Sequence, residues 1–272
     1  MRMTAAALLL LLLPSLAQGA SEGCGQAPPS APPETVEAAG ETREVLVAVP
    51  DDYDPATPHR LVFGFHGRTN PAERVRRYYG LEDAMAEGAP TIFVYPTAKR
   101  QDDGTFIWRV PEDLDLFDAV VEDLSADYCI DRARLFAVGH SLGASFVNTL
   151  GCLRGDALRG IASVAGGIHA RAEDCEGDVA ALLLHNRGDR LVDVDRGRRA
   201  RDVLVEANGL DPAPAGFYPR PFGCYRYGPA EARNPIAWCL YAESVNRRGR
   251  FYPHLWPDGA EEAIAAFFNV LP

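Results

Sequence analysis

The chain lacks several features that would place it in familiar classes of protein. After its first 20 residues, no apolar run approaches the roughly 20 residues that a membrane span needs. No two of its six cysteines have the close spacing of a zinc site, and no internal repeat indicates a repeat architecture. Basic residues are outnumbered, with 27 Lys and Arg against 38 Asp and Glu. The resulting net charge of −11 argues against nucleic acid or an anionic membrane as the main partner.

The amino terminus has the pattern of a secretory signal peptide. Arg2 precedes an apolar block over residues 5–13, and small residues follow around Ala17. We expect residues 1–19 to be this signal, cleaved near Ala17 or Gly19, and the mature protein to be secreted. Such a protein folds in an oxidising compartment.

The remaining chain is expected to form one catalytic domain over residues 41–272, preceded by a Pro/Ala-rich leader segment over residues 20–40 that Cys24 holds in place. Apolar runs alternate with segments of helical periodicity. Strands are expected at 44–49, 61–65, 91–95, 133–138, 161–165 and 179–184, and helices at 72–87, 113–128, 144–150, 194–207 and 261–268. This alternation predicts an α/β fold with a mostly parallel sheet covered by helices on both faces.

A Gly-x-Ser-x-Gly pattern at residues 139–143 predicts a nucleophilic serine, Ser141. When a strand turns at once into a helix, the two backbones come so close that the residues two before and two after the serine must be small. Gly139 and Gly143 meet this demand. An apolar strand is expected before the pattern and a helix after it, so the flanking sequence supports the motif.

The histidine that activates such a serine should lie late in the chain, because the hydrolase fold orders its catalytic residues as serine, acid and histidine. Of the six histidines, only His254 lies beyond the last expected strands. We therefore predict that it is the general base. His66, His140 and His185 are expected to be structural.

The acid that orients this histidine is expected just after the strand at residues 179–184, where a turn can project a carboxylate toward the histidine loop. Asp189 is the first choice there. Asp193 and Asp195 are the alternatives, although both can instead cap the following helix, whose dipole favours negative charge at that end.

Two backbone N–H groups are expected to form the oxyanion hole. One belongs to Leu142, directly after the nucleophile, and the other to Arg68, with Gly67 or Thr69 as alternatives if the turn is shifted by one residue. Serine chemistry of this kind requires no cofactor, and no metal site is expected. Among the three tryptophans, Trp256 is the nearest in sequence to the predicted base and is the candidate for contacting substrate.

All six cysteines are expected to form disulfides, because their number is even and the chain is exported. Fifteen pairings are open. The expected pairs are Cys129–Cys152, Cys224–Cys239 and Cys24–Cys175. The first would join the residue before the nucleophile strand to the end of the helix that returns antiparallel to it. The second would close a local loop, and the third follows by elimination.

Several short motifs resemble those of the secreted esterases that include feruloyl esterases and polyhydroxybutyrate depolymerases, within the α/β-hydrolase superfamily. The similar segments are Gly23-Cys24-Gly25, Leu61 to Arg68, Tyr128 to Asp131, His185 to Asp189, Ile236 to Cys239, and His254 to Pro257. The resemblance covers almost the whole mature chain and implies an α/β-hydrolase fold with Ser141, Asp189 and His254 as the triad. Leu142 departs from the small polar residue that is usual in the elbow, and Tyr252-Pro253 stands where glycines are common.

Together these features predict a secreted serine esterase that works through an acyl-enzyme. By the resemblance, its substrate is a hydroxycinnamoyl sugar ester of plant cell walls. A hydroxyalkanoate polyester is the second expectation and a peptide the third. A catalytically silent hydrolase fold that binds sugar or protein is the alternative of a different class. We expect a monomer.

Overall fold

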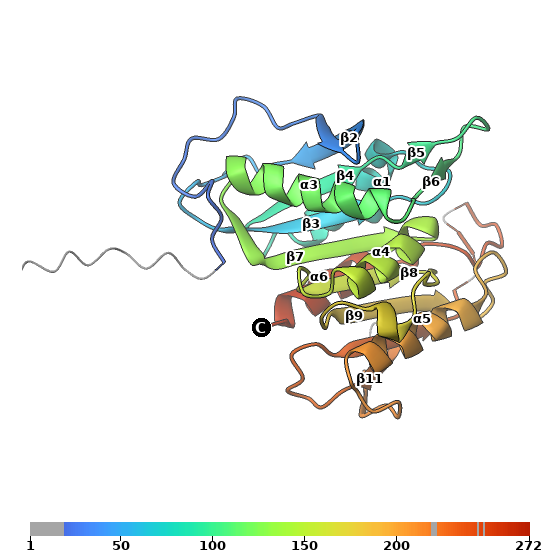
Figure 1. Cartoon of the computed structure of the whole chain (residues 1–272). Helices are drawn as coiled ribbons and strands as arrows, with labels where there is room; N and C mark the ends of the chain where they lie inside the picture. Colours follow the sequence, from blue (N-terminus) through green and yellow to red (C-terminus); the bar gives the residue numbers. More distant parts are fainter. Residues whose placement is uncertain (1–18, 219–221, 244, 247) are drawn as a thin grey trace, which may run out of the picture.

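The computed structural model describes residues 19–218, 222–243, 245–246 and 248–272 (Figure 1). The predicted signal peptide therefore lies outside the described residues, apart from Gly19. Within the described part, one ten-stranded sheet has the order β1-β2-β4-β3-β7-β8-β9-β12-β11-β10. Its strands are β1 (Thr35–Ala38), β2 (Glu41–Ala48), β3 (His59–Phe65), β4 (Thr91–Pro96), β7 (Ile130–His140), β8 (Gly160–Val164), β9 (Ala180–Asn186), β10 (Gly216–Tyr218), β11 (Gly223–Tyr227) and β12 (Ile236–Tyr241).

Helices cover both faces of this sheet, as the alternation of elements predicts. They are α1 (Ala72–Tyr79), α2 (Leu81–Ala84), α3 (Glu112–Asp127), α4 (Leu142–Leu153), α5 (Val194–Ala207) and α6 (Ala260–Val270). Phe117 of α3, Phe146 of α4 and Leu204 of α5 belong to one buried apolar core. The core on the other face includes Val75 of α1 and Phe268 of α6. Two apolar layers thus enclose the sheet and exclude water from its central strands.

The six central strands, from β4 to β12 in sheet order, are all parallel to their neighbours. Their carboxyl ends therefore meet at one edge of the sheet. In Figure 1 the arrowhead of β7 points to this edge, where the small hairpin of β5 (Lys99–Arg100) and β6 (Phe106–Ile107) and the red segment before α6 also lie. Functional loops gather at this edge in parallel sheets.

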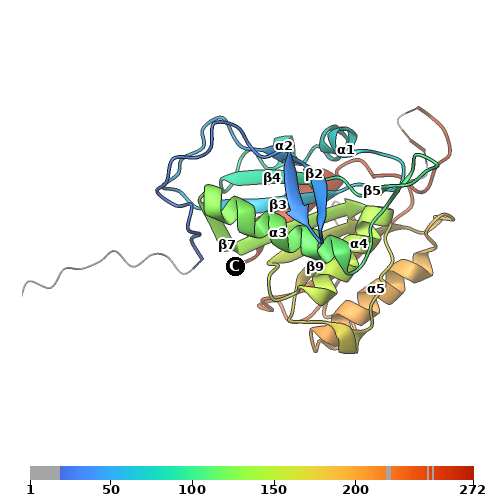
Figure 2. The same ribbon diagram turned by 45° about the horizontal axis from the view of Figure 1, so that its top comes forward.

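Antiparallel strands extend the sheet at both ends, and several of them were absent from our expectation. β1 and β2 form a hairpin that lies across α3 (Figure 2). At the other end β12 pairs with β11, which pairs with β10. The segment 20–40 is therefore more than an extended leader, because it contributes β1 to the sheet. β12 was also missed as a strand, although it lies beside β9 in the parallel part.

The helix expected over residues 72–87 is two helices. Gly80 separates α1 from α2 with φ of 63°. A residue in this left-handed conformation ends a helix, and glycine adopts it without steric cost. The other expected strands and helices are present, with ends shifted by a few residues.

Two of the three expected disulfide pairs were wrong. The structure pairs Cys24 with Cys129 and Cys152 with Cys175, whereas Cys224–Cys239 is confirmed. The expected pairing assumed that the helix after Ser141 returns antiparallel to its own strand and so ends beside Cys129. Instead α4 packs on both β7 and β8, so its end lies beside the turn at residues 172–176, where Glu176 N–H donates to the Cys152 carbonyl.

The amino-terminal segment reaches Cys129 because it packs against the start of β7. Ser21 Oγ donates to the Tyr128 carbonyl at 2.7 Å and accepts from the Ile130 N–H at 2.9 Å. Ser21 is buried by this contact. These bonds place Cys24 beside Cys129. Cys24 thus holds the leader in place as expected, but through another partner.

None of the helices in the described part of the chain combines the length and apolar character that crossing a bilayer requires.

The disulfides should differ in what they contribute to stability. The Cys24–Cys129 bond closes a loop with a sequence separation of 105, against 23 for Cys152–Cys175. On the chain-entropy account, removing the longer loop costs about 1.3 kcal/mol more. We expect the C24S/C129S variant to unfold at lower urea concentration than C152S/C175S. Non-reducing peptide mapping should recover the Cys24–Cys129 and Cys152–Cys175 cross-linked peptides, and recovery of Cys129–Cys152 would contradict the structure.

Candidate active site

Ser141 occupies a sharp turn between β7 and α4. Its φ of 59° lies in the left-handed region, an arrangement that costs of order 1–3 kcal/mol for a residue with a side chain. The neighbouring glycines allow the turn. A Cβ on Gly139 would lie 2.5 Å from the carbonyl carbon of Gly143, and a Cβ on Gly143 would lie 2.0 Å from the Phe65 carbonyl oxygen. The strained turn at Ser141 can therefore form only because both neighbouring positions are glycine.

A chain of two hydrogen bonds joins Ser141 to the predicted base and acid. His254 Nε2 lies 2.7 Å from Ser141 Oγ, and His254 Nδ1 lies 2.6 Å from Asp189 Oδ2. His254 and Asp189 are buried. The carboxylate accepts a hydrogen bond from Nδ1–H. In this tautomer Nε2 carries no proton and can accept a hydrogen bond from the serine hydroxyl. The structure thus brings together the three residues that chain order selects.

Asp189 is held in its ionised form by several donors. Burial alone would raise the pKa of its carboxyl, but hydrogen bonding to His254 and to the backbone N–H groups of Leu191 and Val192 outweighs this and lowers the pKa. The alternatives have other partners. Asp193 caps α5 by accepting from the Asp195 N–H, and Asp195 forms an ion pair with Arg198.

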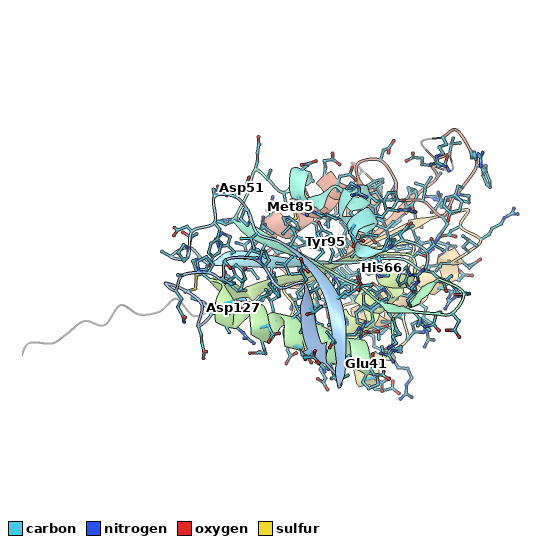
Figure 3. All side chains as sticks on the ribbon, turned by 90° about the horizontal axis from the view of Figure 1, so that it is seen from above. Glu41, Asp51, His66, Met85, Tyr95 and Asp127 are labelled. Carbon is cyan, nitrogen blue, oxygen red and sulfur yellow. A yellow bond between two sulfur atoms is a disulfide. The ribbon has the colours of Figure 1, made fainter. Side chains whose placement is uncertain are left out.

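His66 braces the loop that follows β3. Its Nδ1 donates to the Gly67 carbonyl at 2.8 Å, and its Nε2 accepts from the Ala98 N–H at 3.0 Å. Trp108 Nε1 donates to the His66 carbonyl at 2.9 Å. Figure 3 shows His66 on the side of the molecule away from Asp51 and Asp127. Because both ring nitrogens are used, His66 is structural, as expected.

This braced loop brings Gly67 and Arg68 next to the elbow. A Cβ built on Gly67 would lie 3.5 Å from the Ser141 Cβ, and Phe106 N–H donates to the Arg68 carbonyl at 2.8 Å. The Arg68 side chain points to solvent and lies 3.7 Å from Asp103. Leu142 is the first residue of α4, where N–H groups have no partner within the helix. Both N–H groups of the predicted oxyanion hole thus belong to segments adjoining Ser141.

His140 and His185 flank the triad without joining its hydrogen-bond chain. The His140 ring centroid lies 5.0 Å from that of His254. Burial, with a smaller contribution from the charge of His254, lowers the pKa of His140 to about 3. His185 Nε2 donates to the Val192 carbonyl at 2.8 Å and so braces the turn that carries Asp189.

Trp256 lies mostly in the interior. It is 6% exposed, stacks on Tyr79 with ring centroids 4.3 Å apart, and donates through Nε1 to Glu261 at 2.9 Å. It lines a cavity of about 260 Å³ together with Tyr78 and Tyr252. Contact between Trp256 and substrate stays a prediction, and this cavity is where it would occur.

Polar residues of α4 position the loop after β8, and these were missed from the sequence. Ser145 Oγ accepts from the Gly167 N–H, Thr149 Oγ1 accepts from the His169 N–H, and the Asn148 amide donates to the Gly167 carbonyl. All three side chains are buried in an otherwise apolar helix. Polar residues in an apolar helix could have indicated this role from the sequence, because a buried polar group needs a hydrogen-bond partner.

Solved structures with a similar fold include esterases. An acetyl xylan esterase from Aspergillus awamori has a TM-score of 0.63 at 12% identity, with 83% of this chain and 94% of that one covered. An esterase named PE8 has a TM-score of 0.59 at 17% identity, covering 85% and 99%. At such identity the likeness defines the α/β-hydrolase fold. No protein-family model matches the chain.

Sequence relatives identify the family within this fold. Feruloyl esterase D of Neurospora crassa is 30% identical over 259 residues, 88% of this chain and 87% of the relative. Feruloyl esterase C of Emericella nidulans is 31% identical over 182 residues, 64% of this chain and 65% of the relative. The chain thus spans just under two thirds of the length of feruloyl esterase C. It belongs to the feruloyl esterase family.

The buried histidines predict a loss of stability in acid. Burial lowers the pKa of His66 to about 4 and that of His140 to about 3, whereas an unfolded histidine titrates near 6.5. The stability that they contribute is complete above about pH 6.5 and is lost as the pH falls toward 4, because the unfolded chain binds protons first. Between pH 7 and pH 5, we expect each to lower the free energy of unfolding by about 2 kcal/mol.

Urea titrations of the wild type and of His140→Gln at pH 7 and pH 5 measure this effect. Between pH 7 and pH 5, the free energy of unfolding of the variant should fall by about 2 kcal/mol less than that of the wild type, whatever the absolute stability of the variant. His169→Gln, which removes an exposed imidazole, is the matched control. An identical pH difference in wild type and His140→Gln would show that His140 titrates alike in both states.

Proposed function

We propose that this protein is a secreted serine esterase that hydrolyses hydroxycinnamoyl sugar esters of plant cell walls. The observation that carries the proposal is the unbroken hydrogen-bond chain from Ser141 Oγ through His254 to Asp189. Membership of the feruloyl esterase family supports the proposal that the acyl group of the substrate is hydroxycinnamoyl. Three disulfides support export, because such bonds persist in oxidising compartments.

Acylation begins when Ser141 Oγ attacks the ester carbonyl carbon and gives its proton to His254 Nε2. The carbonyl π electrons move to oxygen, and the N–H groups of Leu142 and Arg68 stabilise that oxyanion. The lowered pKa of Asp189 keeps its carboxylate ionised beside the imidazolium. When the tetrahedral intermediate collapses, the bond to the alkoxy oxygen breaks, and His254 protonates the departing alcohol.

Deacylation repeats these steps with water as the nucleophile. His254 removes a proton from water, hydroxide adds to the acyl carbon, and the bond to Ser141 Oγ breaks as Oγ regains a proton from Nε2. The products are a hydroxycinnamic acid and the sugar alcohol. The sequence of steps uses no metal and no cofactor.

The catalytic roles are tested by matched carboxylate variants. We expect Asp189→Asn to lower kcat on methyl ferulate by about 10⁴-fold, because the wrong histidine tautomer would face Ser141. Asp193→Asn should keep most activity, since asparagine caps a helix about as well as aspartate. Ser141→Ala should abolish turnover. If Asp193→Asn were the inactive variant and Asp189→Asn the active one, the acid would be misassigned.

The substrate class is tested by comparing the wild-type enzyme on methyl ferulate, 3-hydroxybutyrate oligomers and a peptide amide. The highest kcat/KM is expected on methyl ferulate. A preference for the oligomers would make the enzyme a polyester depolymerase, and a preference for the amide a peptidase. Absence of turnover on all three, in protein that is folded by circular dichroism, would favour the silent binding fold.

A further inference from the structure

Exposed arginines lie on the segments that carry Asp189 and His254 and at the start of α5, and we call this group the arginine edge. It consists of Arg187, Arg190, Arg196, Arg248 and Arg250. Arg187 and Arg190 flank the acid Asp189, and Arg248 and Arg250 come from the loop that ends at His254. Within the described residues, no carboxylate forms an ion pair with any of the five.

A shortage of acidic residues does not explain why these five arginines lack carboxylate partners. The chain has 38 acidic residues for 27 basic ones, and several arginines elsewhere have carboxylate partners, although others, such as Arg74 and Arg100, have none among the described residues. Arg43 lies 2.5 Å from Asp113, for example, and Arg76 lies 2.7 Å from Glu82. Five guanidinium groups without a carboxylate partner therefore give this edge a local excess of positive charge on an acidic protein, with Glu243 and Asp258 lining the same cavity as Arg248.

The two loops that carry most of the arginine edge touch each other. Arg187 N–H donates to the Tyr241 carbonyl at 3.0 Å, and the Asn186 amide donates to the Glu243 carbonyl. A Cβ on Gly188 would lie 3.9 Å from the Pro253 Cβ. In Figure 1 the red segment before α6 lies at the same edge as the arrowheads of the central strands. The arginines of both loops thus belong to one continuous surface.

Arg196 extends this surface to the far side of the elbow. A Cβ on Gly167 would lie 3.4 Å from Arg196 Nε, so the arginine lies over the loop after β8. That loop is fixed to the first turn of α4 by the bond from Gly167 N–H to Ser145 Oγ at 3.0 Å. Ser141 precedes this turn, and positive charge therefore lies on more than one side of the nucleophile.

Apolar side chains are exposed between the arginines. Phe251 is 70% exposed, Leu191 65%, Val245 53% and Tyr252 42%. The Tyr252 ring meets that of His254 edge to face, with centroids 6.1 Å apart. Large apolar side chains in solvent next to a catalytic residue indicate a binding surface, because their burial by a ligand is favourable.

A ligand that suits this surface combines carboxylates with apolar ring faces. Guanidinium groups bind carboxylates in bidentate fashion, and aromatic rings pack on flat apolar faces. A chain of uronic acid residues has both features at each sugar. A polysaccharide also extends beyond its ester group, so its neighbouring residues would reach loops on either side of Ser141.

We propose that the arginine edge binds the carboxylates of an acidic, uronic-acid-containing polysaccharide and so places an ester of that polymer at Ser141. This inference rests on the proposed function and deepens it, since it assigns the alcohol part of the substrate. Exposed aromatic side chains of the loop before His254 pack against the sugar rings. Binding is electrostatic in part and weakens as salt screens the charges.

Binding is measured apart from turnover, with the full-length mature protein carrying Ser141→Ala. Isothermal titration with polygalacturonate should give a dissociation constant that rises with ionic strength. Fully methyl-esterified polygalacturonate has the same backbone without the charges and should bind at least tenfold more weakly. Equal affinity for the two polymers, or affinity for double-stranded DNA as high as for polygalacturonate, would overturn the proposal.

Matched charge variants locate the surface. In the Ser141→Ala background, R248Q/R250Q should weaken binding of polygalacturonate at least fivefold. R132Q/R233Q removes the same charge near the amino ends of β7 and β12 and should leave the affinity within twofold. Equal weakening by both pairs would show an effect of net charge alone and would refute the assignment. Thermal unfolding confirms that all variants fold.

Turnover by the enzyme with Ser141 intact separates this inference from the proposed function. For R248Q/R250Q, kcat/KM on a feruloylated uronic acid oligosaccharide, divided by kcat/KM on methyl ferulate, should fall at least fivefold. An unchanged ratio would contradict the arginine edge while leaving the esterase in place. Polymer binding that needs these arginines in a protein inactive on every ester would refute the proposed function and leave the binding surface.

Discussion

The close approach of three backbones at the elbow is the constraint on which the site depends. Gly143 lies against the end of β3 and Gly139 against the start of α4, so neither position has room for a Cβ. In this turn Ser141 has φ of 59°. That conformation directs Oγ toward His254 and places the first N–H groups of α4 beside it. The positions of the proposed nucleophile and of the proposed oxyanion donor thus follow from one steric arrangement.

Burial disfavours the charged form of every ionisable group around this turn, but hydrogen bonds offset it at one of them. It keeps His66 and His140 neutral, so neither adds a positive charge that would repel the imidazolium of His254 during catalysis. Asp189 is also buried, but donated hydrogen bonds keep it ionised. The interior of the site therefore holds one negative charge, on Asp189, that faces the ring of His254, whereas the positive charge of the edge lies outside in solvent.

The sequence was sufficient for features that depend on local chemistry and chain order. The elbow glycines, the central parallel strands and the proximity of Asp189 and His254 to Ser141 follow from steric demands, apolar runs and the order of residues. Features that depend on which strands and helices pack side by side could not be predicted in this way. β12 was missed because nothing local shows that it inserts beside β9, and the Cys129 pairing was wrong because spacing does not reveal that α4 packs toward β8.

The bond between Cys24 and Cys129 also concerns the order of events as the protein is made. A chain that emerges from its amino terminus presents Cys24 when its partner is still 105 residues away. This bond can therefore form only after the start of β7 has emerged. Ser141 follows only 12 residues after Cys129, so the partner that fixes the amino-terminal segment and the proposed nucleophile emerge close together.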